Sequence, residues 1–401
     1  MNRVLMWRAA ACAALVFSSA VASAQPPAAV DDPSLDDVPA LPETVVNARR
    51  FPAEPLAADS ILSAGRVEAS SRSVGSSVTV ITEKQVHATG ARSLDQVLRT
   101  VPGLNIAQSG GLGQTSGIFL RGTNSSQTKV LLDGVPLNDP TSPNRAFDPS
   151  KLQLDNIERI EVVRGAQSTI YGSDAIGGVI NIITKRGNGP AKFTSTAYGG
   201  SFGTFSQSVG VSGGDGRIHY STTGSWLTSD GFSAASAGRE RDGYEIGTLG
   251  GRYGIIISPE LDLDYVWRYS EADIDFDDFD FATNAPGDAK RNLDNQSFQQ
   301  RVQARYFQLD GDLEHRVGFS FNKVHRDDKT SIFSPKFFDG ETRKFDYQAT
   351  AKLLTDQPLT HSVTGGVEHL DEQTLQEGLG QVSQFADAIF FQSDWGLNEQ
   401  W

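Results

Sequence analysis

The chain has 401 residues, a formal net charge of -14, 40 glycines and only 38% hydrophobic residues. The acidic balance argues against a nucleic-acid partner, because binding to phosphates depends on cationic side chains. Beyond the N-terminal region no stretch reaches the ~20 apolar residues of a membrane helix. A helical membrane protein is therefore excluded. A β-barrel stays open, since its strands alternate apolar and polar residues.

The first residues predict a secretory signal peptide over 1–24. Arg3 and Arg8 precede an apolar run, and small residues end at Ala24, after which we expect cleavage. The only cysteine, Cys12, lies inside this segment, so the mature chain is expected to have no disulfide and no thiolate chemistry.

Residues 25–75 predict an extended periplasmic linker, because prolines interrupt small and acidic residues. A short β-prone run lies between two of these prolines and could add as a strand to the edge of a partner's sheet. Its residues are Glu43, Thr44, Val45, Val46, Asn47 and Ala48.

Residues 76–188 predict an α+β domain. Thr82 is placed to cap a helix that starts at Glu83, and Leu94, Val97 and Leu98 share one face of a second helix. The other expected elements are strands over 78–82, 117–121 and 129–133, a helix from Ser93 that Pro102-Gly103 ends, and a turn at Asp133-Gly134.

Residues 190–401 alternate with period two, as Leu261, Leu263 and Tyr265 do against Asp262 and Asp264. This pattern suits both a soluble sandwich and a membrane barrel. Short turns near 213–216, 258–260, 310–312 and 356–358 alternate with expected long links over 229–242, 271–293, 325–340 and 371–384. Alternation of short periplasmic turns with long external loops favours the barrel.

Several motifs of the 76–188 region occur in a characteristic order: Leu120-Arg121-Gly122-Thr123-Asn124, the run from Lys129 to Asn138, the run from Ile157 to Ala166, and the run from Ile170 to Thr184. This order resembles the plug domain of TonB-dependent outer-membrane receptors. The resemblance implies an N-terminal α+β plug followed by antiparallel transmembrane β-barrel strands in a Gram-negative outer membrane. It also implies that the run from Glu43 to Ala48 is the TonB box, which binds the energy-transducing partner TonB.

About ten barrel strands are expected, whereas barrels of this family have about twenty-two. The last residues, from Gly396 to Trp401, do not resemble a closing strand. We therefore expect a truncated chain with roughly half a barrel. Such a chain is not expected to transport alone, because open edges in lipid leave backbone groups unpaired.

The run from Gln108 to Asn138, and within it Gly110 to Asn124 above all, closely resembles the cobalamin-receptor branch of this family. The resemblance implies ligand contacts at Thr115, Gly117, Asn124, Ser142 and Pro143. A ferric-siderophore receptor is the alternative, since such receptors share the plug motifs. The glycines by themselves could also serve only tight turns.

Two expected external links are rich in carboxylates, which repel one another unless they are hydrated or neutralised. Calcium takes six to eight oxygen ligands and tolerates flexible loops. The alternative is a solvated acidic rim. Resemblance to the cobalamin-receptor branch implies a structural calcium ion at Asp230, Glu240, Asp242, Phe276 (through its carbonyl oxygen), Asp277 and Asp288.

No catalytic motif is present. The chain has no paired cysteines and no HExxH motif, and the glycine run at 110–113 lacks the Gly-Lys-Ser/Thr of a phosphate loop. We expect a transporter rather than an enzyme, with no catalytic cofactor. The other class considered is a non-transporting adhesin or sensor. A sensor would need a folded domain before the box, and residues 25–42 are too short and proline-rich for one.

Overall fold

The computed structural model describes residues 60–61, 69–70, 75–235, 240–280, 285–329, 336–354 and 359–397. The predicted signal peptide and the run from Glu43 to Ala48 lie outside these residues. Two short strands, β1 (Ser60–Ile61) and β2 (Ala69–Ser70), pair antiparallel. The described helices include none that is both long and apolar enough to cross a membrane.

The plug region of the described chain is built on a five-stranded sheet of order β3-β8-β9-β6-β7, in which only β6 and β9 are parallel. A separate antiparallel pair joins β4 to β5. The strands are β3 (Ser77–Thr82), β4 (Leu104–Gln108), β5 (Ser116–Leu120), β6 (Thr128–Leu132), β7 (Val135–Pro136), β8 (Ile157–Arg164) and β9 (Gly178–Thr184).

Local sequence explains the helices. Thr82 caps α2 (Glu83–Thr89) through a capping box, since its amide donates to Gln85 Oε1 at 2.8 Å and its hydroxyl accepts from the Gln85 amide. The helix ends at Gly90, whose φ is +69°. The shorter helical elements are α3 (Leu94–Leu98), α4 (Ser168–Tyr171), η1 (Ser125–Gln127), η2 (Pro149–Lys151) and η3 (Ser173–Ala175).

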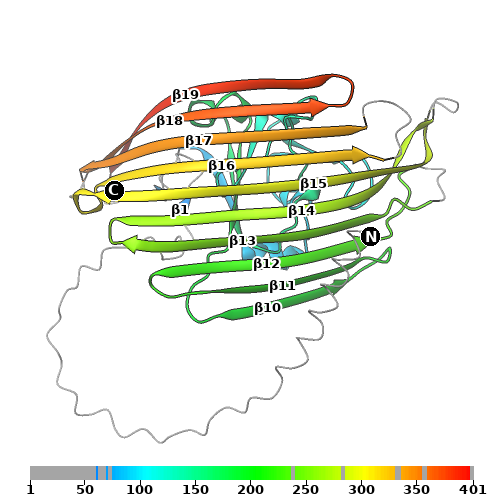
Figure 1. The fold of residues 1–401 in the computed structure, drawn as a ribbon, viewed down its shortest axis with the longest axis horizontal. Helices are drawn as coiled ribbons and strands as arrows, with labels where there is room; N and C mark the ends of the chain where they lie inside the picture. Colours follow the sequence, from blue (N-terminus) through cyan, green and yellow to red (C-terminus); the bar gives the residue numbers. More distant parts are fainter. Residues whose placement is uncertain are drawn as a thin grey trace, which may run out of the picture. The chain divides into compact units, whose positions relative to one another are not determined.

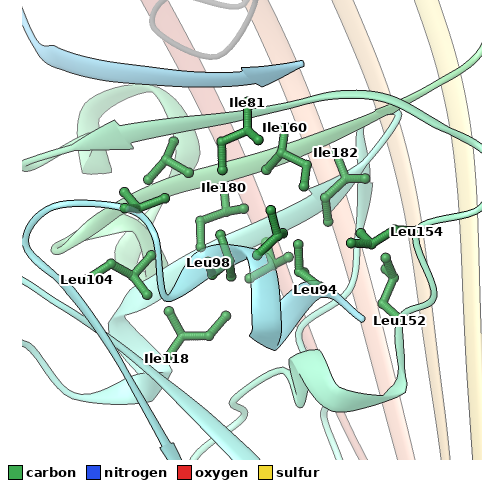
Figure 2. Packing of buried hydrophobic residues seen from close by; sticks show 14 of the residues in the cluster. Ile81, Leu94, Leu98, Leu104, Ile118, Leu152, Leu154, Ile160, Ile180 and Ile182 are labelled. Carbon is green, nitrogen blue, oxygen red and sulfur yellow. The ribbon is translucent and has the colours of Figure 1, made fainter. Parts of the chain in front are cut away.

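The core of the plug region lies between α3 and the sheet. Leu94 and Leu98 are fully buried and face Ile180 of β9, as Figure 2 shows. Full burial of one such side chain stabilises the fold by about 1.5–3 kcal/mol. The expected start of this helix is thus confirmed, with Ser93 as its N-cap, but the helix ends at Leu98, before Pro102-Gly103.

After the plug region, ten strands in the described chain form one antiparallel sheet in sequence order (Figure 1). They are β10 (Lys192–Gly199), β11 (Phe205–Gly214), β12 (Ile218–Ser229), β13 (Tyr244–Ser258), β14 (Leu261–Asp280), β15 (Ala285–Gln308), β16 (Leu313–Asp328), β17 (Phe337–Leu354), β18 (Leu359–Gln376) and β19 (Gly380–Leu397), with η4 (Leu309–Gly311) between β15 and β16. The expected number of strands is confirmed.

The sheet turns its polar face inward, toward the plug region. Asp264 and Arg268 of β14 are buried, whereas the outward Phe319 and Phe345 are 47% and 45% exposed. A soluble sandwich would bury the apolar face instead. The pattern is that of a membrane barrel wall, and we call this sheet the wall.

Two of the expected long links are wrong. β14 and β15 stay paired from Leu261↔Tyr306 to Asp280↔Ala285, with one irregularity between Phe276 and Asp278, so most of 271–293 is a hairpin. Likewise β18 and β19 pair as far as Gln376↔Gly380. Beyond the apolar band a strand no longer needs an apolar outer face, so the alternation fades although backbone pairing continues. The link over 230–243 is present as expected.

Candidate functional site

Ion pairs fasten the plug region to the wall. Arg252 of β13 lies 3.1 Å from Asp133 of the plug turn and 3.1 Å from Asp264 of the wall. Arg186, which follows β9, lies 2.7 Å from the same Asp264. Asp133 also accepts from the Thr184 hydroxyl at 2.7 Å, which orients its carboxylate. Charges from both parts thus share one buried cluster.

The charged side chains of β8 lie within the plug region. Arg159 Nε lies 2.8 Å from Glu161 Oε1, and the Glu161 side chain is 0% exposed. Arg164 donates to the Pro102 carbonyl oxygen and to Thr79. The Arg159–Glu161 pair is therefore buried inside the plug region and does not lie on its surface.

A cavity of about 240 Å³ lies between the plug apex and the wall. Three of the five expected ligand residues, Thr115, Gly117 and Ser142, line it from two separate plug segments, the start of β5 and the turn that carries Ser142. Asn124 and Pro143 are exposed and are not among its lining residues. The Asn124 amide instead donates to Gln127 Oε1 at 3.0 Å, next to η1.

The wall supplies the other side of this cavity, and the sequence analysis missed its contribution. The residues are polar and come from inward-facing positions of three neighbouring strands. The period-two pattern could have marked these positions. They are Arg268, Ser270, Asn295, Ser297, Gln299, Asn322 and Arg326.

Three expected metal ligands lie together. One carboxylate oxygen from each of Glu240, Asp242 and Asp277 lies within 4.8 Å of the others. Asp277 Oδ2 accepts from the Ala235 amide at 2.6 Å, and Asp242 Oδ2 accepts from the Ala234 amide at 2.8 Å. We call these three carboxylates the acidic cluster.

The side chains of the other expected metal ligands are not part of the acidic cluster. Asp230 is 57% exposed and forms an ion pair with Arg241 at 2.8 Å. Asp288 lies in β15 next to Gly287, which pairs with Asp278, but its side chain is outside the described part. Phe276 packs under the Arg291 guanidinium, 5.1 Å from the ring centroid.

The plug apex and one member of the acidic cluster, Asp277, line the same cavity. A second cavity, of about 320 Å³, is lined by Gln114 and Thr115 of the apex and by Phe276 and Asp277 of β14. Gln114 Nε2 donates to the Asp275 carbonyl oxygen at 2.7 Å. Thr115 lines both cavities, so the acidic cluster and the expected ligand residues are neighbours.

Comparison with known proteins agrees with this architecture. Residues 70–179 match the family described as TonB-dependent receptor plug domain. This part of the chain is therefore a plug domain of the kind found in TonB-dependent receptors. The plug domain is followed by antiparallel strands of a transmembrane β-barrel, and the location is the outer membrane.

A relative named vitamin B12 transporter, from Photobacterium profundum, is 35% identical over 225 residues, which cover 54% of this chain and 36% of that protein. The chain thus spans about a third of the length of this curated relative.

Solved structures of siderophore receptors share the fold of the plug domain and strands. PirA from Acinetobacter baumannii gives a TM-score of 0.62 at 19% identity, covering 80% of this chain and 55% of that one. The ferripyoverdine receptor of the Pseudomonas aeruginosa outer membrane gives 0.60 at 16% identity, covering 82% and 50%. At these identities the likeness concerns the fold alone.

Proposed function

We propose that this protein serves the energised uptake of a scarce ligand across the outer membrane, and that the ligand is cobalamin. The observation that carries the proposal is the meeting of Thr115, Gly117 and Ser142, from two separate plug segments, at one cavity beside the wall. The 35% identity to a vitamin B12 transporter supports the choice of ligand.

The chemistry of the cavity suits a large polar ligand. Backbone and hydroxyl groups of the apex loops face amides and guanidinium groups of the wall, including Asn295, Asn322 and Arg326. These groups donate and accept hydrogen bonds without fixing a single charge on the ligand. Release would follow when the partner TonB pairs with the run from Glu43 to Ala48 as an added strand and pulls on the plug domain.

A calcium ion at the acidic cluster is part of this proposal. Asp277 Oδ1 is buried and has no hydrogen-bond partner among the described residues, so it is available as a ligand atom. Carboxylates from the 230–243 link and from β14 lie within 4.8 Å of one another, and a cation between them would lower their mutual repulsion. Calcium suits an all-oxygen site of flexible geometry and would hold the link against β14.

Binding measurements on outer membranes that contain the protein test the proposal. We expect saturable cobalamin binding that strengthens with calcium, because ordering the link beforehand removes an entropic cost from binding. Magnesium should substitute poorly, since it dehydrates reluctantly and demands octahedral geometry. Asp277→Asn should weaken the calcium dependence.

The matched control is Asp230→Asn, which alters an acidic residue of the same link that pairs with Arg241. It should leave the calcium dependence in place. Equal cobalamin affinity with and without calcium would contradict the calcium site and would indicate that the acidic cluster is only a solvated acidic rim. If the protein binds no cobalamin but binds a ferric siderophore saturably, the proposed ligand is wrong and the siderophore is the ligand.

A further inference from the structure

The cavity-lining turn over 139–146 is held in an unusual conformation. Arg145 has a φ of +55°, a left-handed value that costs free energy for a residue other than glycine. Its amide donates to the Ser142 carbonyl oxygen at 2.9 Å, which closes the turn. Ser142 and Asn144 of this turn line the proposed ligand cavity. Surrounding contacts must therefore stabilise the strained residue.

The Arg145 side chain spans from the turn to the wall. Its Nη2 lies 2.8 Å and 2.7 Å from the two carboxylate oxygens of Glu372 on β18. The Glu372 side chain is only 5% exposed, so the carboxylate end of this ion pair is shielded from solvent, whereas the Arg145 side chain is 34% exposed. Gln384 of β19 donates to the same carboxylate and orients it.

The same guanidinium also faces the core of the plug domain. Nη2 lies 3.8 Å from Asp174 Oδ2, and that carboxylate pairs with Lys129 of β6 at 3.0 Å. Asn138 secures the backbone on this side. It is 2% exposed, and its Nδ2 donates to the Arg145 carbonyl oxygen at 3.3 Å. Arg145 is thus shared between a carboxylate of the wall and one of the plug core.

A second contact holds the other end of the turn. Arg326 of β16 donates to the Thr141 hydroxyl and lies 3.4 Å from Asp139. Arg326 lines the cavity itself, so altering it would change the lining as well as the turn. Arg145 and Glu372 are not among the lining residues, which makes them the cleaner probes.

We propose that Arg145 is a positioning residue, whose ion pair with Glu372 holds the strained turn so that Ser142 and Asn144 face the ligand. The inference rests on the proposed function for its ligand. Any displacement of the plug domain from the wall must break this pair, and the turn then loses the contact that offsets its backbone strain. The affinity for the ligand therefore depends on the position of the plug domain against the wall.

The variants Glu372→Gln and Arg145→Lys test this role. Glu372→Gln keeps the size of the side chain but loses the charge, and Arg145→Lys keeps the charge but loses the bidentate geometry. The matched control is Glu341→Gln. Thr342, the next residue after Glu341 on β17, pairs with Glu372, and Glu341 itself forms ion pairs with Lys323 and Arg343 on the outward face.

Two readouts separate the role of the turn from the identity of the ligand. The first is the electron paramagnetic resonance spectrum of a nitroxide at Pro143→Cys, an exposed position in the turn. Cys12, the chain's only cysteine, lies in the predicted signal peptide, so labelling is specific after cleavage. We expect a more mobile spectrum in Glu372→Gln and an unchanged spectrum in Glu341→Gln.

The second readout is cobalamin affinity, which should fall roughly tenfold in Glu372→Gln, less in Arg145→Lys, and not in Glu341→Gln. Identical spectra for Glu372→Gln and the unaltered chain would overturn the positioning role, whatever the ligand. A mobile spectrum with undiminished cobalamin affinity would also overturn it, because the turn would then not matter for binding. If the unaltered chain binds no cobalamin, the proposed function fails while the spectra still decide the role of Arg145.

Discussion

The ring of Tyr244, on β13, packs directly against Gly113 at the plug apex. A Cβ atom built on Gly113 would lie 2.1 Å from Tyr244 Cδ2, and the φ of Gly113 is +80°. Only glycine combines this backbone conformation with so close an approach. The wall therefore shapes the apex loop from which Thr115 and Gly117 reach the cavity.

Gly113→Ala should lower both thermal stability and cobalamin affinity, because the tyrosine ring and the apex loop must separate. The matched control is Gly122→Ala, at φ +77° with no atom within 4 Å of the added carbon. It carries the strain of the left-handed conformation, about 1–2 kcal/mol, without the collision. Equal losses of affinity in the two variants would contradict the role of the Tyr244 contact.

Arg252→Gln should loosen the plug domain in the wall. Asp264 keeps its ion pair with Arg186, whereas the buried carboxylate of Asp133 loses its cation, a change that costs about 3 kcal/mol. Limited proteolysis of the plug domain measures the effect, and cleavage should be faster. Arg305→Gln removes a comparable cation whose partner, Asp262, lies on the wall, and it should leave plug cleavage unchanged.

The environment of Asp174 predicts that the stability of the folded chain depends on pH. Burial by itself raises the pKa of this carboxyl group, but Lys129 and Arg145 outweigh burial and hold the pKa below its ordinary value of 3.8. A carboxyl group whose pKa is lower in the folded than in the unfolded state stabilises the fold at a pH above its unfolded-state pKa. This stabilisation is lost as the pH falls through its folded-state pKa. Asp174→Asn should therefore destabilise the chain by about 3 kcal/mol at neutral pH.

Urea unfolding at a series of pH values checks this sign. The difference between Asp174→Asn and the unaltered chain should be constant near neutrality and should shrink as the pH is lowered below 3.8. A difference that grows in acid would contradict the assignment of Lys129 and Arg145 as the stabilising partners.

Val45→Pro tests the run proposed to bind TonB. Proline removes a backbone donor and restricts φ, so pairing with the partner's sheet edge should fail. In cells that carry a complete receptor containing this chain, we expect Val45→Pro to abolish cobalamin uptake while cobalamin binding to the outer membranes persists. Uptake at the normal rate would rule out this run as the TonB box.

Sequence alone determined the features that depend on neighbours along the chain. Thr82 and Gln85 are three residues apart, so the cap of α2 could be predicted from them. The strict alternation from Leu261 onward identified the strands and their polar face, because successive side chains of a strand point to opposite sides. The Asp133-Gly134 turn was also predictable, and both residues have positive φ.

Only the tertiary structure decided which distant residues meet. Glu240, Asp242 and Asp277 converge because the 230–243 link folds onto the end of β14, whereas Asp230 is diverted to Arg241. Nothing in the local pattern distinguishes these four carboxylates. The wall side of the cavity likewise required the register of β14, β15 and β16, since it brings Arg268, Gln299 and Asn322 to one surface. Distances between strands depend on pairing across the sheet, and a linear sequence records that pairing only indirectly.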